Sequence, residues 1–153
     1  MTRIIVYTLV LGLLGCTSNK KSEESKSEDF GLEKIITGQW TNLSMQIQLG
    51  SVDSLISVPE GQWESILNMK PILTTFNPDG TYDSKYTSLA DTVLFTDSGK
   101  WEIKLDSLYL TSGDNTTSYK FQFEDPIGTF TGYLDWDNDG ENNDLYTGRQ
   151  RKN

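Results

Sequence analysis

Alternation of apolar and polar side chains between closely spaced turns is the feature that most constrains the fold of this chain. In the segments 100–105 and 119–124, apolar residues occupy every second position. A period of two places apolar side chains on one face of a β-strand and polar side chains on the other. Turn-forming sequences at 77–80 and 125–128, each containing Pro, Asp and Gly, separate such segments. The pattern therefore predicts an all-β fold in which each strand has one buried and one solvated face.

Eight strands are expected, joined by links of hairpin length, at 39–49, 72–77, 81–87, 99–104, 107–112, 117–124, 128–135 and 145–151. A meander with one apolar face best avoids open sheet edges by closing on itself. We therefore predict an eight-stranded antiparallel up-and-down barrel over residues 30–153. A short helix is expected between the first two strands, at about 59–69, because Trp63, Ile66 and Leu67 have helical spacing. This helix is positioned to cover one mouth of the barrel, and a further helical turn is expected at about 32–36.

The first 29 residues predict export and lipid anchoring. Residues 1–15 have the pattern of a signal peptide, with Arg3 before an apolar run that is too short to span a bilayer. The only cysteine, Cys16, follows Leu-Leu-Gly, which resembles the lipobox of bacterial lipoproteins, in which this cysteine is acylated. Residues 16–29 then form the lipidated cysteine and a polar tether, because 17–29 contain no apolar residue. The alternative is an ordinary secretory signal followed by an unrelated cysteine.

Location follows from the same resemblance. In the lipoprotein sorting pattern, an aspartate directly after the lipidated cysteine retains the protein in the inner membrane, whereas this chain has Thr17. The resemblance thus implies an outer-membrane or cell-surface protein of a Gram-negative envelope, attached to the membrane through covalent lipid on Cys16.

The beginning and end of the predicted barrel resemble the lipocalin-like superfamily. Gly38-Gln39-Trp40 at the start of the first strand resembles its Gly-x-Trp motif, and Arg149 in the last strand matches the arginine that packs over the indole. Arg151 is the alternative partner. A cation over a partly desolvated indole contributes about 1–2 kcal/mol, so Gly38, Trp40 and Arg149 form a predicted barrel clasp. The nearest likeness is the small lipocalin-like domain of bacterial lipoproteins, whose function is generally unassigned.

An acidic segment between the last two predicted strands is the clearest candidate metal site. Alternate oxygen-bearing residues around the turn-forming Gly140 resemble a calcium loop, and the candidate ligands are Asp135, Asp137, Asp139, the Glu141 carbonyl and Asn143. Position twelve of the pattern is Tyr146 instead of a bidentate Glu, so Asp144 or water has to complete the site. The alternative is a solvated hairpin tip without metal.

The barrel lumen is the second candidate site. An eight-stranded barrel is either filled by side chains or holds one small ligand. The candidate pocket residues are Trp63, Trp101, Phe121 and Phe130. The leading functional hypothesis is binding of a small apolar or amphipathic ligand in the lumen. The alternative is an interaction or scaffold module that recognises protein or glycan through its outer surface, with calcium ordering the loop 135–144.

Charge and composition remove several other functions. The chain contains no histidine, and 13 basic against 22 acidic residues give a net charge of −9. Histidine is the usual general base and partner of a catalytic nucleophile, and no catalytic motif is present, so we expect no enzyme activity. An acidic chain lacks the basic surface that nucleic-acid binding requires. We expect a monomer without cofactors other than calcium.

Overall fold

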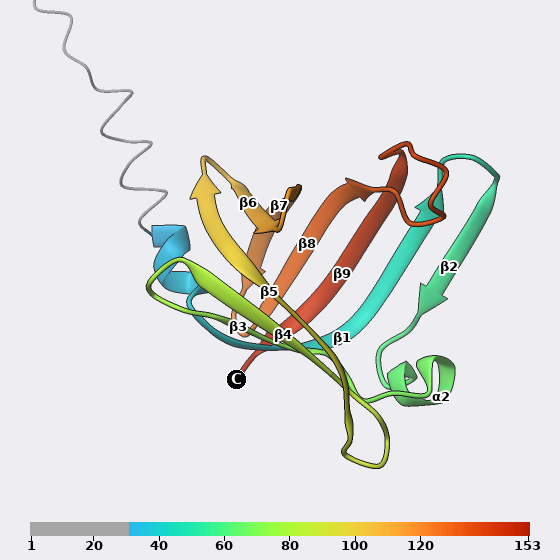
Figure 1. Ribbon diagram of the computed structural model, residues 1–153, viewed down its shortest axis with the longest axis horizontal. Coiled ribbons are helices and arrows are strands. Elements are labelled where there is room, and N and C mark those ends of the chain that lie inside the picture. Colours follow the sequence, from blue (N-terminus) through green and yellow to red (C-terminus); the bar gives the residue numbers. More distant parts are fainter. Residues whose placement is uncertain (1–30) are drawn as a thin grey trace, which may run out of the picture.

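Nine β-strands and two short helices form residues 31–153, the part of the chain that the computed structural model describes (Figure 1). A helix over residues 31–36 precedes the strands, and α2 (Trp63–Leu67) lies between β2 and β3. The strands are β1 (Gly38–Leu49), β2 (Ser54–Val58), β3 (Leu73–Phe76), β4 (Thr81–Thr87), β5 (Val93–Lys104), β6 (Ser107–Ser112), β7 (Asn115–Glu124), β8 (Ile127–Leu134) and β9 (Asp144–Lys152). The predicted signal peptide, Cys16 and the tether lie outside the described residues.

Eight of these strands close into an antiparallel barrel, as predicted. Each strand from β3 to β9 pairs with its neighbour in sequence, β3 pairs with β1, and β9 pairs back with β1. The closing register runs from Trp40 opposite Lys152 to Gln48 opposite Leu145. No open edge therefore remains between the first and last barrel strands.

The ninth strand, β2, was not expected. The first part of the long strand β1, residues 38–41, pairs with β3, whereas residues 45–49 pair with β2. β2 thus extends the sheet where β3 no longer reaches. Three of its five residues are exposed and only Ile56 and Val58 pack against the core, which is too short an alternation to predict a strand. The expected helix still lies between the first two strands of the closed barrel, β1 and β3.

Strand β5 begins six residues earlier than the sequence pattern predicted. Residues 93–98 pair with β4 and extend the barrel wall, although their side chains do not alternate in polarity. Val93, Leu94 and Phe95 are 51–60% exposed. An apolar run that stays in solvent gives no periodic signal, which explains the shorter prediction.

Trp40 organises the first of two hydrophobic clusters, at the barrel end next to the helix over 31–36. Its indole Nε1 donates to the Ile36 carbonyl at 2.7 Å. The rings of Phe121 and Phe130 meet it edge-on, with centroids 5.9 and 5.8 Å away. A Cβ at Gly128 would lie 2.7 Å from the indole, so only glycine leaves room for it there. These contacts seal this end of the barrel.

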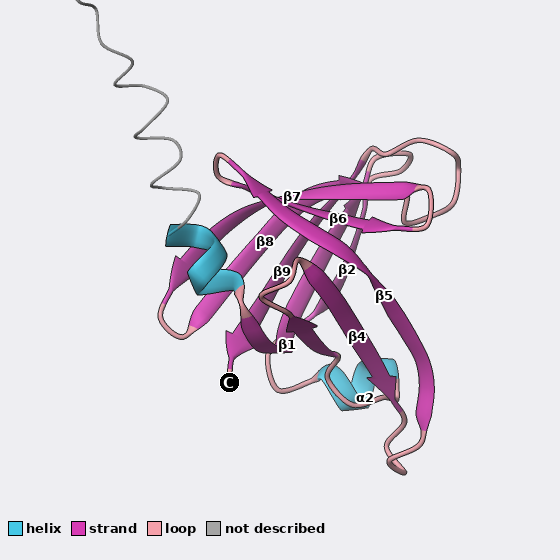
Figure 2. Cartoon of the chain, turned by 60° about the vertical axis from the view of Figure 1, so that its left-hand side comes forward, coloured by secondary structure: helices cyan, strands magenta, loops and turns pink. Residues whose placement is uncertain are grey.

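A second cluster lies under α2 at the other end. Trp63, which is 3% exposed, packs with Met45, Ile47 and Val58. The helix is five residues long instead of the expected eleven: it begins at Trp63 and not at Pro59, and Asn68, in a left-handed conformation with φ 53°, ends it. The chain after the helix then attaches to the β4–β5 hairpin, since the Lys70 N–H donates to the Thr87 carbonyl at 2.9 Å (Figure 2). Within residues 31–153, neither helix is long and apolar enough to cross a bilayer.

Candidate functional site

A cavity of about 160 Å³, partly open to solvent, lies in the barrel lumen. All eight strands of the closed barrel contribute to its wall, so it is the lumen itself and not a surface groove. The lining residues are Asn42, Ile72, Thr74, Phe76, Tyr82, Ser84, Tyr86, Asp97, Leu108, Leu110, Tyr119, Phe130, Tyr146 and Gln150. The set mixes aromatic and aliphatic side chains with amide, hydroxyl and carboxylate groups.

The four predicted pocket residues do not come together around this cavity. Phe130 lines it, but Trp101 and Phe121 belong to the sealed cluster around Trp40. Trp63 lies in the second cluster and does not border the cavity. Phe130 is thus the one predicted pocket residue that lines this cavity, and the other three do not border it. Around Trp40 large rings pack against one another and fill the space they enclose. The void lies where amide, hydroxyl and carboxylate side chains interrupt the aromatic ones on the inner face.

Asp97 on β5 is the centre of the polar wall. The Tyr82 hydroxyl donates to Asp97 Oδ2 at 2.9 Å, and Ser112 Oγ donates to Oδ1 at 2.8 Å. Across the same wall, the hydroxyls of Thr74 and Ser84 are hydrogen-bonded at 2.9 Å. The alternation pattern did not single out Asp97, because it lies in the exposed half of β5.

Tyrosines form the opposite side of the cavity. Burial raises the pKa of Tyr119 to about 12. Burial also raises the pKa of Tyr146, and the two rings meet edge-on with centroids 5.8 Å apart. Both phenols therefore remain neutral at physiological pH. Beside them, the buried Oε1 of Gln150 has no hydrogen-bond partner among the described residues.

Glycines within the strands make room for these rings. The Tyr146 ring lies over Gly148, where a Cβ would be 2.0 Å from the phenol oxygen. At Gly99, a Cβ would be 3.0 Å from the Tyr82 ring and 2.0 Å from the Thr111 carbonyl oxygen. Glycines inside the predicted strands, Gly99 and Gly148, are thus the sequence signal that could have indicated where rings pack in the lumen.

The barrel clasp is formed by a different cation from the one predicted. Lys152 Nζ lies 5.8 Å from the centre of the Trp40 ring and donates to the Ile35 carbonyl. Lys152 is opposite Trp40 in the β1–β9 register, so both side chains face inward. Gly38, with φ 125°, admits the lysine stem, because Lys152 Cε would lie 3.3 Å from a Cβ there. Gly38 and Trp40 thus lie in the clasp as predicted.

Arg149 and Arg151 are on the outside of the barrel. Arg149 is opposite Ser44 in the register, and its Nη1 lies 3.0 Å from Glu60 Oε2. Arg151 Nη2 lies 3.8 Å from the other oxygen of Glu60. The prediction that either arginine covers the indole is therefore wrong. Side chains alternate faces along a strand, and Lys152 is the residue whose position in the register faces the same side as Trp40.

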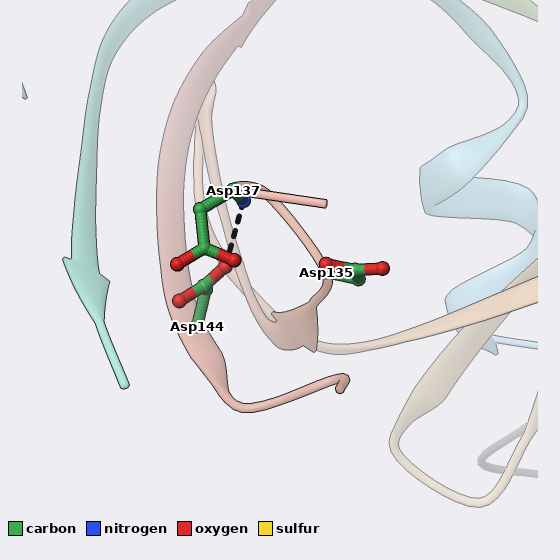
Figure 3. Close-up of side chains that lie close together, drawn as sticks. All are labelled: Asp135, Asp137 and Asp144. Atoms are coloured by element: carbon green, nitrogen blue, oxygen red, sulfur yellow. Dashed lines mark hydrogen bonds between the residues drawn. The ribbon is translucent and has the colours of Figure 1, made fainter. Parts of the chain in front are cut away.

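The acidic loop brings three carboxylates together (Figure 3). One oxygen each of Asp135, Asp137 and Asp144 lies within 4.8 Å of the others. Two oxygens that bind one calcium ion at 2.3–2.6 Å are at most roughly 5 Å apart. These three residues could therefore hold a metal ion.

Asp144 is the buried organiser of this loop. Its Oδ2 accepts the backbone N–H groups of Trp136 at 2.6 Å and Asp137 at 3.2 Å, and its Oδ1 accepts that of Gly50 at 2.9 Å. These bonds, the one from Gly50 foremost, lower the pKa of the Asp144 carboxyl. The carboxylate is thus held ionised while it fixes the entry and exit of the loop.

The other predicted calcium ligands, Asp139, Glu141 and Asn143, take part in contacts within and next to the loop. Asp139 Oδ1 accepts the Glu141 N–H at 2.8 Å, and the Glu141 carbonyl accepts the Asn143 N–H at 2.9 Å. These bonds shape the loop backbone. Of the alternating ligand set expected from the sequence, Asp135 and Asp137 belong to the three-carboxylate cluster, which Asp144 completes. Asn143 packs against Gly50, and its buried Oδ1 has no partner among the described residues.

Comparison of the chain with protein-family profiles and with curated protein sequences finds no match. The functional conclusion therefore depends on the geometry of the lumen cavity, the clasp and the acidic loop. Of these three, the lumen cavity is the feature that offers a volume inside the barrel to a ligand.

Proposed function

We propose that this protein is a lipid-anchored envelope lipoprotein whose barrel binds a small amphipathic molecule in its lumen and catalyses no reaction. The observation that carries the proposal is the cavity of about 160 Å³ that the eight barrel strands line. A protein cavity of roughly 150 Å³ is large enough to hold benzene. The mixed lining favours a ligand with an apolar body and a polar group, because each buried polar group needs a partner.

The end of the barrel opposite the Trp40 cluster is the proposed entrance. The Phe95 ring lies on the same side of its strand pair as Tyr86, with ring centroids 4.8 Å apart. Tyr86 lines the cavity, whereas Phe95 is 55% exposed. Aromatic rings thus continue from the cavity wall to the solvent along the β4–β5 hairpin. A ligand with an apolar body can follow this path into the lumen.

Relationship to the lipocalin-like superfamily is part of the proposal. Gly38 and Trp40 open β1 after a short helix, and a cation from the last strand lies over the indole. This chain uses Lys152 for that cation instead of an arginine. Both side chains are cationic and have a long apolar stem, so either can cover an indole.

Attachment and location rest on the sequence before residue 30. The Leu-Leu-Gly-Cys sequence ending at Cys16 supports acylation, and the polar run over 17–29 supports a tether of roughly 20 Å reach. Thr17 supports transport to the outer membrane or cell surface. The barrel then works as a monomer held near the membrane by lipid.

Filling the cavity tests the binding function. Leu110 lines the lumen and is not fully buried, so Leu110→Trp adds bulk to the cavity while its strand pairing stays intact. We expect this variant to lose binding of a small lumen probe such as benzyl alcohol, measured by isothermal titration calorimetry. Tyr133→Trp, at a 62% exposed position on the outside of β8, is the matched control and keeps binding. Equal affinity in both variants would place the ligand elsewhere and refute lumen binding.

A second candidate is an interaction module whose outer loop is ordered by calcium. The supporting observation is the cluster of Asp135, Asp137 and Asp144, next to which Asp135 Oδ1 is buried without a partner. A hard cation prefers such carboxylate oxygens and relieves their mutual repulsion. The ordered loop then presents Trp136, which is 41% exposed, to a protein or glycan.

Thermal melting in millimolar calcium tests this candidate. Calcium that binds the folded state raises the melting temperature by mass action. The rise should disappear in Asp137→Asn and persist in Asp114→Asn, which removes the same charge from the exposed β6–β7 turn. A melting temperature that does not respond to calcium would remove the metal from the proposal.

A further inference from the structure

The lumen cavity contains one ionisable carboxylate and no cation. Asp97 is the only charged side chain among the described residues that line it. Tyr82 and Ser112 each donate one hydrogen bond to this carboxylate. A carboxylate offers about four acceptor positions, so Asp97 retains acceptor capacity toward a further donor. The electrostatic character of the cavity is therefore negative.

The remaining polar groups of the wall also favour a donor that carries positive charge. The buried Gln150 Oε1 has no partner among the described residues and can only accept. Tyr86 and Tyr119 lie close enough to Asp97 for its negative charge to contribute to their raised pKa values. Aromatic faces attract cations, and the attraction grows when water is excluded. Carboxylate, amide oxygen and aromatic faces are thus gathered around one space.

We propose that the lumen binds a small primary ammonium ion with an aromatic or short aliphatic body. The ammonium group donates to Asp97, and the body lies against the rings of Tyr119, Tyr146 and Phe130. This inference rests on lumen binding, the proposed function, and specifies its ligand class. Burying an ammonium ion is costly unless it is paired and hydrogen-bonded, and Asp97 supplies both. The Asp97 carboxylate repels an anionic ligand.

Three probes of similar shape test whether the lumen of the full chain prefers a positively charged ligand. Benzylammonium, benzyl alcohol and benzoate share a ring of similar size and differ in charge. We expect benzylammonium to bind about 10- to 100-fold more tightly than benzyl alcohol, because hydrogen bonds between charged groups are that much stronger. Benzoate should show no binding. The measurement is isothermal titration calorimetry at pH 7.

The Asp97→Asn variant identifies the group responsible. It should lower the affinity for benzylammonium to that for benzyl alcohol, about 10-fold or more, and leave the affinity for benzyl alcohol unchanged. Asp83→Asn is the matched control, because Asp83 is an exposed acid on the outer face of the neighbouring strand β4. It removes the same charge and should leave all affinities unchanged.

The outcomes separate this inference from the function on which it rests. Benzyl alcohol that binds as tightly as benzylammonium would overturn the ammonium proposal and leave lumen binding intact. An unchanged benzylammonium affinity in Asp97→Asn, or an equal loss in Asp83→Asn, would also overturn it. If neither benzylammonium nor benzyl alcohol binds, both proposals are overturned. The comparison of the three probes uses the unaltered chain, so it is decisive even if Asp97→Asn does not fold.

Discussion

Gly148 provides the sharpest test of how the lumen is built. The Tyr146 ring lies over this glycine on the inner face of β9, and a Cβ there would be 2.0 Å from the phenol oxygen. In Gly148→Ala the ring has to retreat from 2.0 Å to at least the 3.4 Å of ordinary contact. The backbone of β9 blocks retreat toward the wall, so the ring moves into the cavity.

The size of the effect follows from where the ring goes. Overpacking a filled core costs typically about 1–3 kcal/mol, but here the cavity of about 160 Å³ can receive the displaced ring. We expect a loss of stability near the lower end, about 1–2 kcal/mol. For a domain of this size that corresponds to a fall in melting temperature of roughly 3–10 °C. The same movement occupies the ligand space, so lumen binding should be abolished.

Denaturant unfolding and titration with benzyl alcohol measure the two effects in one variant. Gly31→Ala is the control, because no atom lies within 4 Å of its Cβ position. It should leave binding unchanged and should not lower stability, because alanine favours the helix over 31–36 more than glycine does. Full stability with full binding in Gly148→Ala would show that the Tyr146 ring does not lie over residue 148. A loss above about 4 kcal/mol, beyond ordinary overpacking, would show that the lumen has no room for the ring.

Three further outcomes are expected. Trp40→Ala should lower the free energy of unfolding by about 3–5 kcal/mol in urea titration, whereas Trp136→Ala, at an exposed position, should have little effect; similar losses in both would refute the clasp as the core of the barrel. Because the folded-state pKa of Tyr119 is raised to about 12 from 10.0, the stability it contributes is complete below pH 10 and is lost as the pH rises toward 12. Tyr119→Phe should weaken this alkaline loss in unfolding measured from pH 9 to 12, and an unchanged loss would contradict the assignment. Cys16→Ser should abolish palmitate labelling and release a folded protein from the membrane; labelling that persists would refute the anchor.

The barrel strands could be predicted because each satisfies a local condition. Segments such as 119–124 alternate in polarity, which is the pattern of a strand with one buried face. Strands whose residues do not alternate in polarity were missed or predicted too short. Three of the five residues of β2 and most of the first half of β5 are exposed, so neither segment has an apolar face long enough to give a periodic signal.

The candidate site was predicted less well, because it depends on register and packing. The sequence predicted Arg149, with Arg151 as the alternative, as the partner of Trp40, but both lie one register step from the inward positions, and a shift of one residue moves a side chain to the other face of the sheet. Only the pairing of β9 with β1 assigns the position to Lys152. In the acidic loop, the burial of Asp144 and its three bonds from backbone N–H groups decide which carboxylates meet.

The sequence by itself determined that residues from the first strand onward form an antiparallel barrel, because polarity with a period of two and turn residues act locally along the chain. Tertiary structure alone decided where the barrel is solid and where it is hollow. That outcome depends on which side chains from different strands meet inside. Large rings around Trp40 fill one end, while Tyr146 over Gly148 and Tyr82 beside Gly99 leave the space that Asp97 faces.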